Sequence, residues 1–200
     1  MMDRFWLLSN TCYGTWLPGS RHGFVSQILE HRPHDAPDDR RVTHDLPGTA
    51  YDEDLPALEA AAKSQMRGPP IYLTTAHSEI CLAQFQETAR HRGWQIRAVA
   101  IMFNHFHIVL GVPGDPSPSK LLGDFKSWAT RRLSATFGKP ASETWWTERG
   151  SKRKLPNEVA VLNAIRYVIY DQPNPLLTWS PETGLHLGLP PNPSLASVEA

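Results

Sequence analysis

Cysteine is scarce in this 200-residue chain, and no long apolar run is present. Two cysteines, Cys12 and Cys81, exclude a disulfide framework and a zinc site built from cysteines. A membrane-spanning helix needs about 18 consecutive apolar residues. The N-terminus offers only a short apolar stretch at 5–8, which is too short for a signal peptide. We therefore expect a protein of the reducing cytoplasm with no membrane partner.

The chain also lacks net charge, since 20 basic residues balance 20 acidic ones. The balance hides two regions of opposite sign. Residues 30–60 hold nine acidic and three basic residues, and residues 120–154 hold nine basic and three acidic ones. Because nucleic acid responds to the local distribution of basic residues, zero total charge does not exclude a DNA partner.

The order of the expected elements indicates an α+β fold. Aromatic and β-branched residues predict strands at 4–13, 94–103, 105–112 and within 144–155. Apolar residues at helical spacing predict helices at 78–91 and 120–137, the second with its inward stripe at Leu121, Leu122, Phe125, Trp128, Ala129 and Leu133. This order is that of a ferredoxin-like (RRM-like) antiparallel sheet with helices on one face.

Outside this core we expect three additions. An acidic insertion at about 30–70 holds one short helix at 55–66, a C-terminal helix begins after the N-cap Asn157, and a proline-rich tail occupies 176–200. The single catalytic domain then covers 1–175. One hypothesis is that the insertion shields the basic region until DNA displaces it.

The motif His105-Phe106-His107 is the most specific sign of a functional site in the sequence. Side chains alternate along a strand, so both imidazoles lie on one face while Phe106 points into the core. Two adjacent imidazoles make a bidentate metal site that lacks a third ligand.

The C-terminal helix presents a tyrosine. Leu162, Ile165 and Ile169 define its expected buried stripe, and Tyr167 lies nearly opposite to that stripe with Asp171 on the same face. A metal held by both histidines and Asp171 would place Tyr167 beside a Lewis acid, where its phenolic oxygen could attack phosphorus.

Basic and aromatic residues indicate how DNA would be held. Trp145, Trp146 and Trp94 are candidates for base stacking. The basic residues expected to follow the DNA backbone are Lys126, Arg131, Arg132, Lys152, Arg153 and Lys154.

Together these motifs resemble the HUH-type tyrosine transposases of the single-strand insertion-sequence group, including the REP-associated tyrosine transposases. The resemblance covers residues 4–172. It is carried by His105-Phe106-His107 and Arg166-Tyr167-Val168 with Asp171-Gln172, and by the flanking stretches 13–19, 68–70, 92–94, 145–147 and 150–153.

The resemblance implies a single-strand DNA endonuclease and strand transferase. Tyr167 would form a 5′-phosphotyrosine link and release a 3′-hydroxyl, while the two histidines and a polar residue after the tyrosine would hold Mg²⁺ or Mn²⁺. Two imidazoles favour Mn²⁺, and availability favours Mg²⁺. Members recognise DNA hairpins, and they act as monomers or as homodimers.

Two assignments stay open at this point. Helical geometry favours Asp171 as the third ligand, but Gln172 precedes Pro173 and is free to leave the helical conformation. Tyr170 is a second candidate nucleophile, although Pro173 interrupts its downstream motif.

Two other functions compete with cleavage by tyrosine. A domesticated protein could bind hairpins without cutting them. A zinc- or manganese-dependent phosphoesterase would use a metal-bound water, and Tyr167 would then be incidental.

Overall fold

The computed structural model describes residues 2–20, 27–29, 41–43 and 55–190. The strands are β1 (Arg4–Thr11), β2 (Gln27–Leu29), β3 (Arg41–Thr43), β4 (Gln95–Ile101), β5 (His105–Val112), β6 (Ser151–Leu155), β7 (Leu177–Ser180) and β8 (Gly184–Leu187). The helices are α1 (Pro56–Ser64), α2 (Thr75–Arg92), α3 (Pro118–Phe137) and α4 (Glu158–Tyr170). Within the described ranges, none of these helices has the length and apolar character to cross a membrane.

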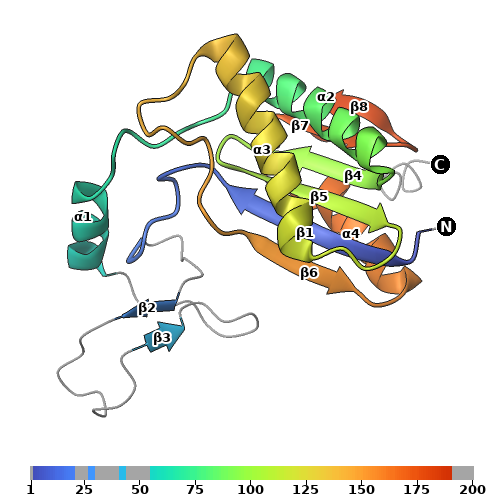
Figure 1. The fold of residues 1–200 in the computed structure, drawn as a ribbon, viewed down its shortest axis with the longest axis horizontal. Coiled ribbons are helices and arrows are strands. Elements are labelled where there is room, and N and C mark those ends of the chain that lie inside the picture. The colour runs from blue at the N-terminus through green and yellow to red at the C-terminus, as the bar shows by residue number, and fades with distance from the viewer. Residues whose placement is uncertain (1, 21–26, 30–40, 44–54, 191–200) are drawn as a thin grey trace, which may run out of the picture.

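Six strands form one antiparallel sheet in the order β6-β1-β5-β4-β7-β8 (Figure 1). Its first four strands have the ferredoxin-like order, with β1 and β5 in the middle. The helices α2 and α3 pack on one face of the sheet, and α4 packs on the other. The predicted α+β, ferredoxin-like fold is confirmed.

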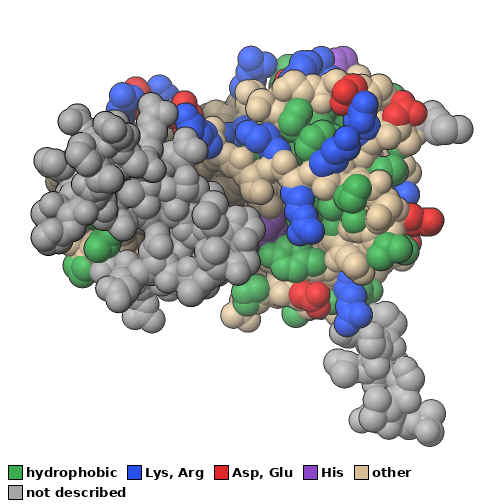
Figure 2. All heavy atoms as spheres, turned by 90° about the horizontal axis from the view of Figure 1, so that it is seen from below, with side chains coloured by type: hydrophobic (Ala, Val, Ile, Leu, Met, Phe, Trp, Pro, Cys, Tyr) green, Lys and Arg blue, Asp and Glu red, His purple; other side chains and the backbone are tan. Residues whose placement is uncertain are grey.

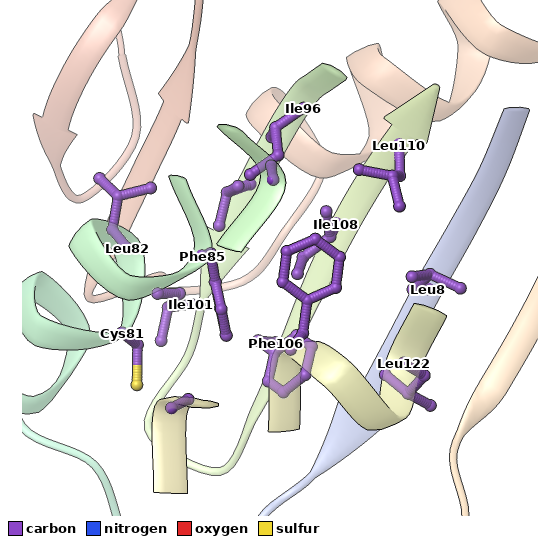
Figure 3. Close-up of a cluster of buried hydrophobic side chains, with 14 of the residues drawn as sticks. Leu8, Cys81, Leu82, Phe85, Ile96, Ile101, Phe106, Ile108, Leu110 and Leu122 are labelled. Atoms are coloured by element: carbon purple, nitrogen blue, oxygen red, sulfur yellow. The ribbon is translucent and has the colours of Figure 1, made fainter. Parts of the chain in front are cut away.

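Aromatic rings fill the face covered by α2 and α3. Phe106 of β5 meets Phe85 of α2 with ring centroids 5.0 Å apart, and Phe85 meets Phe125 of α3 at 5.5 Å. All three side chains are fully buried (Figure 3 shows Phe85 and Phe106). Trp128 was expected on the inward stripe of α3, but it is 39% exposed and lies under the Arg131 guanidinium at 4.5 Å.

The opposite face of the sheet carries a second, smaller core that is mainly aliphatic. Ala98 and Ala100 of β4 pack with α4, whose buried residues are Val161, Ala164, Val168 and Ile169. The predicted stripe is therefore wrong at Leu162, which is 56% exposed. The helix is rolled so that Val161, Ala164 and Val168 face the sheet and Leu162 lies in solvent.

The sheet continues past the boundary expected at residue 175. β7 pairs with β4, and β8 pairs with β7, so residues 177–187 are an edge hairpin of the sheet rather than a surface tail. Leu177 is fully buried. Pro173 and Pro175 end the helix, but they do not prevent a strand from starting directly after them.

The insertion is described only in part. α1 lies inside the helix predicted at 55–66, and its N-terminal flank is fixed by a hydrogen bond from the Leu55 amide to the Gly19 carbonyl. Residues 30–40 and 44–54, on which the shielding hypothesis depends, lie outside the described residues.

Candidate active site

The two histidines share the face of the sheet that α4 covers. Along β5, Phe106 is fully buried in the opposite core, and the rings of His105 and His107 lie 5.0 Å apart. In the register of the sheet, His107 pairs with Ser9 of β1. The predicted alternation of this motif is therefore present.

Hydrogen bonds orient both imidazoles. His105 Nδ1 lies 2.6 Å from Asn104 Oδ1, and His107 Nδ1 lies 2.5 Å from Ser9 Oγ. A carboxamide oxygen only accepts, so Nδ1 of His105 donates and its Nε2 keeps the lone pair. Such partners commonly fix the ring orientation of a metal-binding histidine.

Both imidazoles are neutral at pH 7. Burial lowers the pKa of His105 to about 4 and that of His107 to about 3. The neighbouring His105 lowers the pKa of His107 further, whereas a hydrogen bond to the Gln172 side chain raises it. The neutral imidazole is the form that binds metal ions.

Tyr167 lies beside this pair. Its ring centroid is 5.6 Å from that of His107, and its side chain is 42% exposed. The start of its helix is fixed because the Asn157 side chain accepts a hydrogen bond from the Ala160 amide at 2.9 Å, as predicted for an N-cap. Tyr170 instead packs partly buried against the small-residue core beneath α4.

Gln172, rather than Asp171, accompanies the histidines. Gln172 is 4% exposed, its Nε2 donates to the Tyr167 carbonyl at 3.0 Å, and its side chain is hydrogen-bonded to His107. Asp171 caps the end of α4 and is exposed. Among the described residues, no three His, Cys, Asp or Glu side chains gather to hold a metal ion.

This arrangement differs from the expected preference for Asp171, and the reason is geometric. Gln172 lies beyond the end of α4, and its buried side chain turns back to the Tyr167 carbonyl and to His107. Two neutral imidazoles and a carboxamide oxygen form a donor set that fits a divalent cation such as Mn²⁺ or Mg²⁺.

The predicted DNA-binding residues fall into two groups. Lys126 is half-buried, and its Nζ donates to the carbonyls of Thr147 and Glu148 at 2.6 and 2.8 Å. Burial lowers its pKa to about 8. Its ammonium group therefore holds the segment before β6 in place. The second group is more accessible to a ligand: Lys152 is partly buried, and the exposed residues are Arg131, Arg153 and Lys154.

β6 brings one of these cations to the histidine face. Ser151 pairs with Ser9, the partner of His107, and Arg153 follows two residues later on the same face. Lys152 and Lys154 lie on the opposite face. Lys and Arg side chains are spread over the molecule seen from below, and a histidine side chain reaches the surface between them (Figure 2).

The aromatic residues predicted to stack bases are core residues instead. Trp145 and Trp146 are 5% and 3% exposed, and Trp94 packs against Phe125 with centroids 5.5 Å apart. The ring that does approach the site is Trp16, at 5.9 Å from His105. Sequence reasoning also missed Ser9 and Asn104, although each could be found as a polar neighbour of a histidine, in register or in sequence.

The fold and this site together define an α+β protein whose paired histidines face a helix-borne tyrosine. Residues 71–151 match the family described as "Transposase IS200 like". The match confirms the family resemblance and covers both histidines, and Tyr167 lies beyond its end.

A solved structure of a REP-associated tyrosine transposase bound to a REP hairpin aligns at 13% identity and a TM-score of 0.43, over 86% of this chain and 67% of that one. No curated protein matches the sequence.

Proposed function

We propose that this chain is a metal-dependent single-strand DNA endonuclease and strand transferase that cuts at hairpin-associated sites. The main observation behind this proposal is that the ring centroids of Tyr167 and His107 lie 5.6 Å apart. A half-exposed phenol beside two neutral imidazoles is accessible to a DNA phosphodiester. The IS200-like match over the histidines supports the same reaction.

In the proposed reaction, Tyr167 Oη attacks the phosphorus and forms a new P–O bond. The bond from phosphorus to O3′ breaks, its electron pair stays on O3′, and O3′ takes a proton from solvent to become the released 3′-hydroxyl. The phenol proton leaves to solvent, and the DNA downstream of the cut remains joined to Tyr167 through its 5′ phosphate. A divalent cation held by His105, His107 and Gln172 would neutralise charge on the phosphate.

The proposed partner is single-stranded DNA that forms a hairpin. Arg131, Lys152, Arg153 and Lys154 are the residues that would contact phosphates, so binding should weaken steeply as salt rises. We propose that Tyr167 acts with His107 of its own chain, because the centroids of the two rings lie 5.6 Å apart. This holds for a monomer and for a homodimer, and the cytoplasm is the expected compartment.

Covalent adduct formation tests the nucleophile. The protein is incubated with Mn²⁺ and 3′-labelled single strands from the DNA flanking its own gene, and the products are separated on a denaturing gel. The wild type and Tyr170→Phe should give a shifted band, and Tyr167→Phe should give none. Hairpin binding without any adduct would indicate a non-cleaving binding protein, and cleavage that survives Tyr167→Phe would indicate a phosphoesterase.

Metal titration tests the third ligand. Mn²⁺ affinity is measured by calorimetry for Gln172→Ala and, as the matched control, for its neighbour Asp171→Ala. We expect Gln172→Ala to weaken binding by about tenfold or more, and Asp171→Ala to change it little. The reverse result would restore Asp171 as the ligand.

A further inference from the structure

Two exposed aromatic rings lie stacked at the connection between β4 and β5, which leads into His105. Tyr72 is 56% exposed and Phe103 is 49% exposed, and their ring centroids are 5.7 Å apart with an interplanar angle of 26°. Phe103 precedes His105 by only two residues, so its backbone lies within about 7 Å of that histidine. The cleavage chemistry uses neither ring.

The backbone holds both rings in place. The Leu73 amide donates to the Phe103 carbonyl at 2.6 Å, which ties the two ring-bearing segments together. The Cys12 amide donates to the Asn104 carbonyl at 2.7 Å, and the Ile71 amide donates to the Tyr13 carbonyl at 2.9 Å. The stack is therefore anchored to the end of β1 and preorganised for a ligand.

The segments that carry and anchor the stack bear little charge. Residues 9–20, 65–74 and 101–107 contain no acidic residue and one basic residue, Arg67, whose guanidinium lies 3.8 Å from the Glu143 carboxylate. Arg67 follows the end of α1, and its amide donates to the Tyr13 hydroxyl at 2.8 Å. A phosphate chain passing the rings would meet no like charge from these segments.

We propose that Tyr72 and Phe103 form a stacking subsite for an unpaired nucleobase next to the cleaved phosphodiester. The inference rests on the proposed function. An unpaired base offers a free π-face to an aromatic side chain, and such stacking tolerates any base. A base inside a duplex is already covered by its neighbours, so the subsite selects single-stranded DNA and adds affinity that the exposed cations do not supply.

Affinity for oligodeoxythymidylate tests the subsite. Binding of a fluorescent strand is followed by anisotropy in EDTA, where no cleavage occurs. The variant Tyr72→Ala/Phe103→Ala should bind about tenfold more weakly or worse. Tyr72→Phe and Phe103→Tyr keep the rings and should bind like the wild type. Leu187→Ala removes an apolar side chain that is 60% exposed on β8, at the far edge of the sheet, and should also have no effect.

A base-free strand supplies the second readout. An oligomer of abasic sugar-phosphates should bind the wild type and the double variant equally, because no base is present to stack. A 2-aminopurine placed along the strand should be quenched at one position by the wild type and not by the double variant. If the double variant fails to fold, Phe103→Leu keeps the apolar volume without the planar face and should show the same loss.

Three results would overturn the subsite. These are unchanged affinity in a folded double variant, an equal loss toward the abasic strand, or a change in self-association without a change in DNA binding. The adduct assay separates the two proposals. If an adduct forms at Tyr167 but DNA binding does not depend on the two rings, the cleavage proposal is kept and the subsite is rejected. If binding depends on the rings but no adduct forms, the subsite is kept and the cleavage proposal is rejected.

Discussion

The two faces of the central sheet are packed with different types of side chain. The face under α2 and α3 is filled by large rings, including the fully buried Phe85, Phe106 and Phe125. The face under α4 is filled mainly by aliphatic side chains, among them Ala98, Ala100, Val168 and Ile169, and the buried polar residues His107 and Gln172 lie beside it. One face therefore supplies most of the apolar burial, and the other keeps polar groups next to a single helix.

Adjacent residues of β5 belong to opposite faces of the sheet. Phe106 joins the aromatic core, and His105 and His107 turn to the α4 face. Because side chains alternate along a strand, a change at one of these positions should leave the opposite face largely intact. The two faces can thus be tested separately by substitution.

The largest effect should come from Phe106→Ala. Loss of a fully buried ring costs about 3–5 kcal/mol of unfolding free energy, measured by urea denaturation. His107→Ala should lower the free energy of unfolding much less at pH 7. Mn²⁺ should stabilise the wild type and should not stabilise this variant. Equal losses of stability in the two variants would contradict the division between the faces.

Acid should act most strongly on the α4 face. Burial holds the pKa of His105 near 4 and that of His107 near 3, below the unfolded value of about 6.5. The unfolded chain therefore binds protons first, and stability falls as pH drops below 6.5, by roughly 1–2 kcal/mol for each histidine at pH 5. His105→Asn/His107→Gln should flatten the profile measured by denaturation between pH 7 and 5, whereas an unchanged slope would assign the loss to other groups.

A pair of substitutions on α4 tests how this helix is rolled. Val168 is fully buried and Leu162 is 56% exposed. Val168→Ala should cost about 1–2 kcal/mol, while Leu162→Ala should stay within about 0.5 kcal/mol. Thermal or chemical denaturation of both variants measures the difference, and a larger loss at Leu162 would restore the stripe expected from the sequence.

A further substitution tests how His105 is oriented within the site. Asn104→Ala removes the oxygen that accepts from His105 Nδ1, which lies 2.6 Å away. The backbone carbonyl of residue 104 still pairs with Cys12, so the fold should be kept. Mn²⁺ affinity, measured by calorimetry, should fall by about tenfold. Unchanged affinity would show that packing alone orients the ring.

The sequence predicts the site better where strand geometry decides and worse where packing decides. The alternation at His105, Phe106 and His107 follows from the strand period, and Asn157 follows from cap chemistry. The orientation of α4 about its own axis depends on how Ala164 packs against the alanines of β4. Hydrophobicity alone predicts that Leu162 is buried in preference to Ala164. The short strands β7 and β8 follow two prolines, so local sequence gives no reason to expect a continued sheet.

The edge hairpin has a mechanical consequence for the tyrosine helix. α4 enters from β6 at one edge of the sheet and leaves into β7, which is bonded to β4, while the Leu176 amide donates to the Ile101 carbonyl at 2.8 Å. Both ends of α4 are thus joined to strands of the same sheet. If Tyr167 is the nucleophile of the proposed reaction, the DNA joined to it would lie against a helix that the sheet holds at both ends.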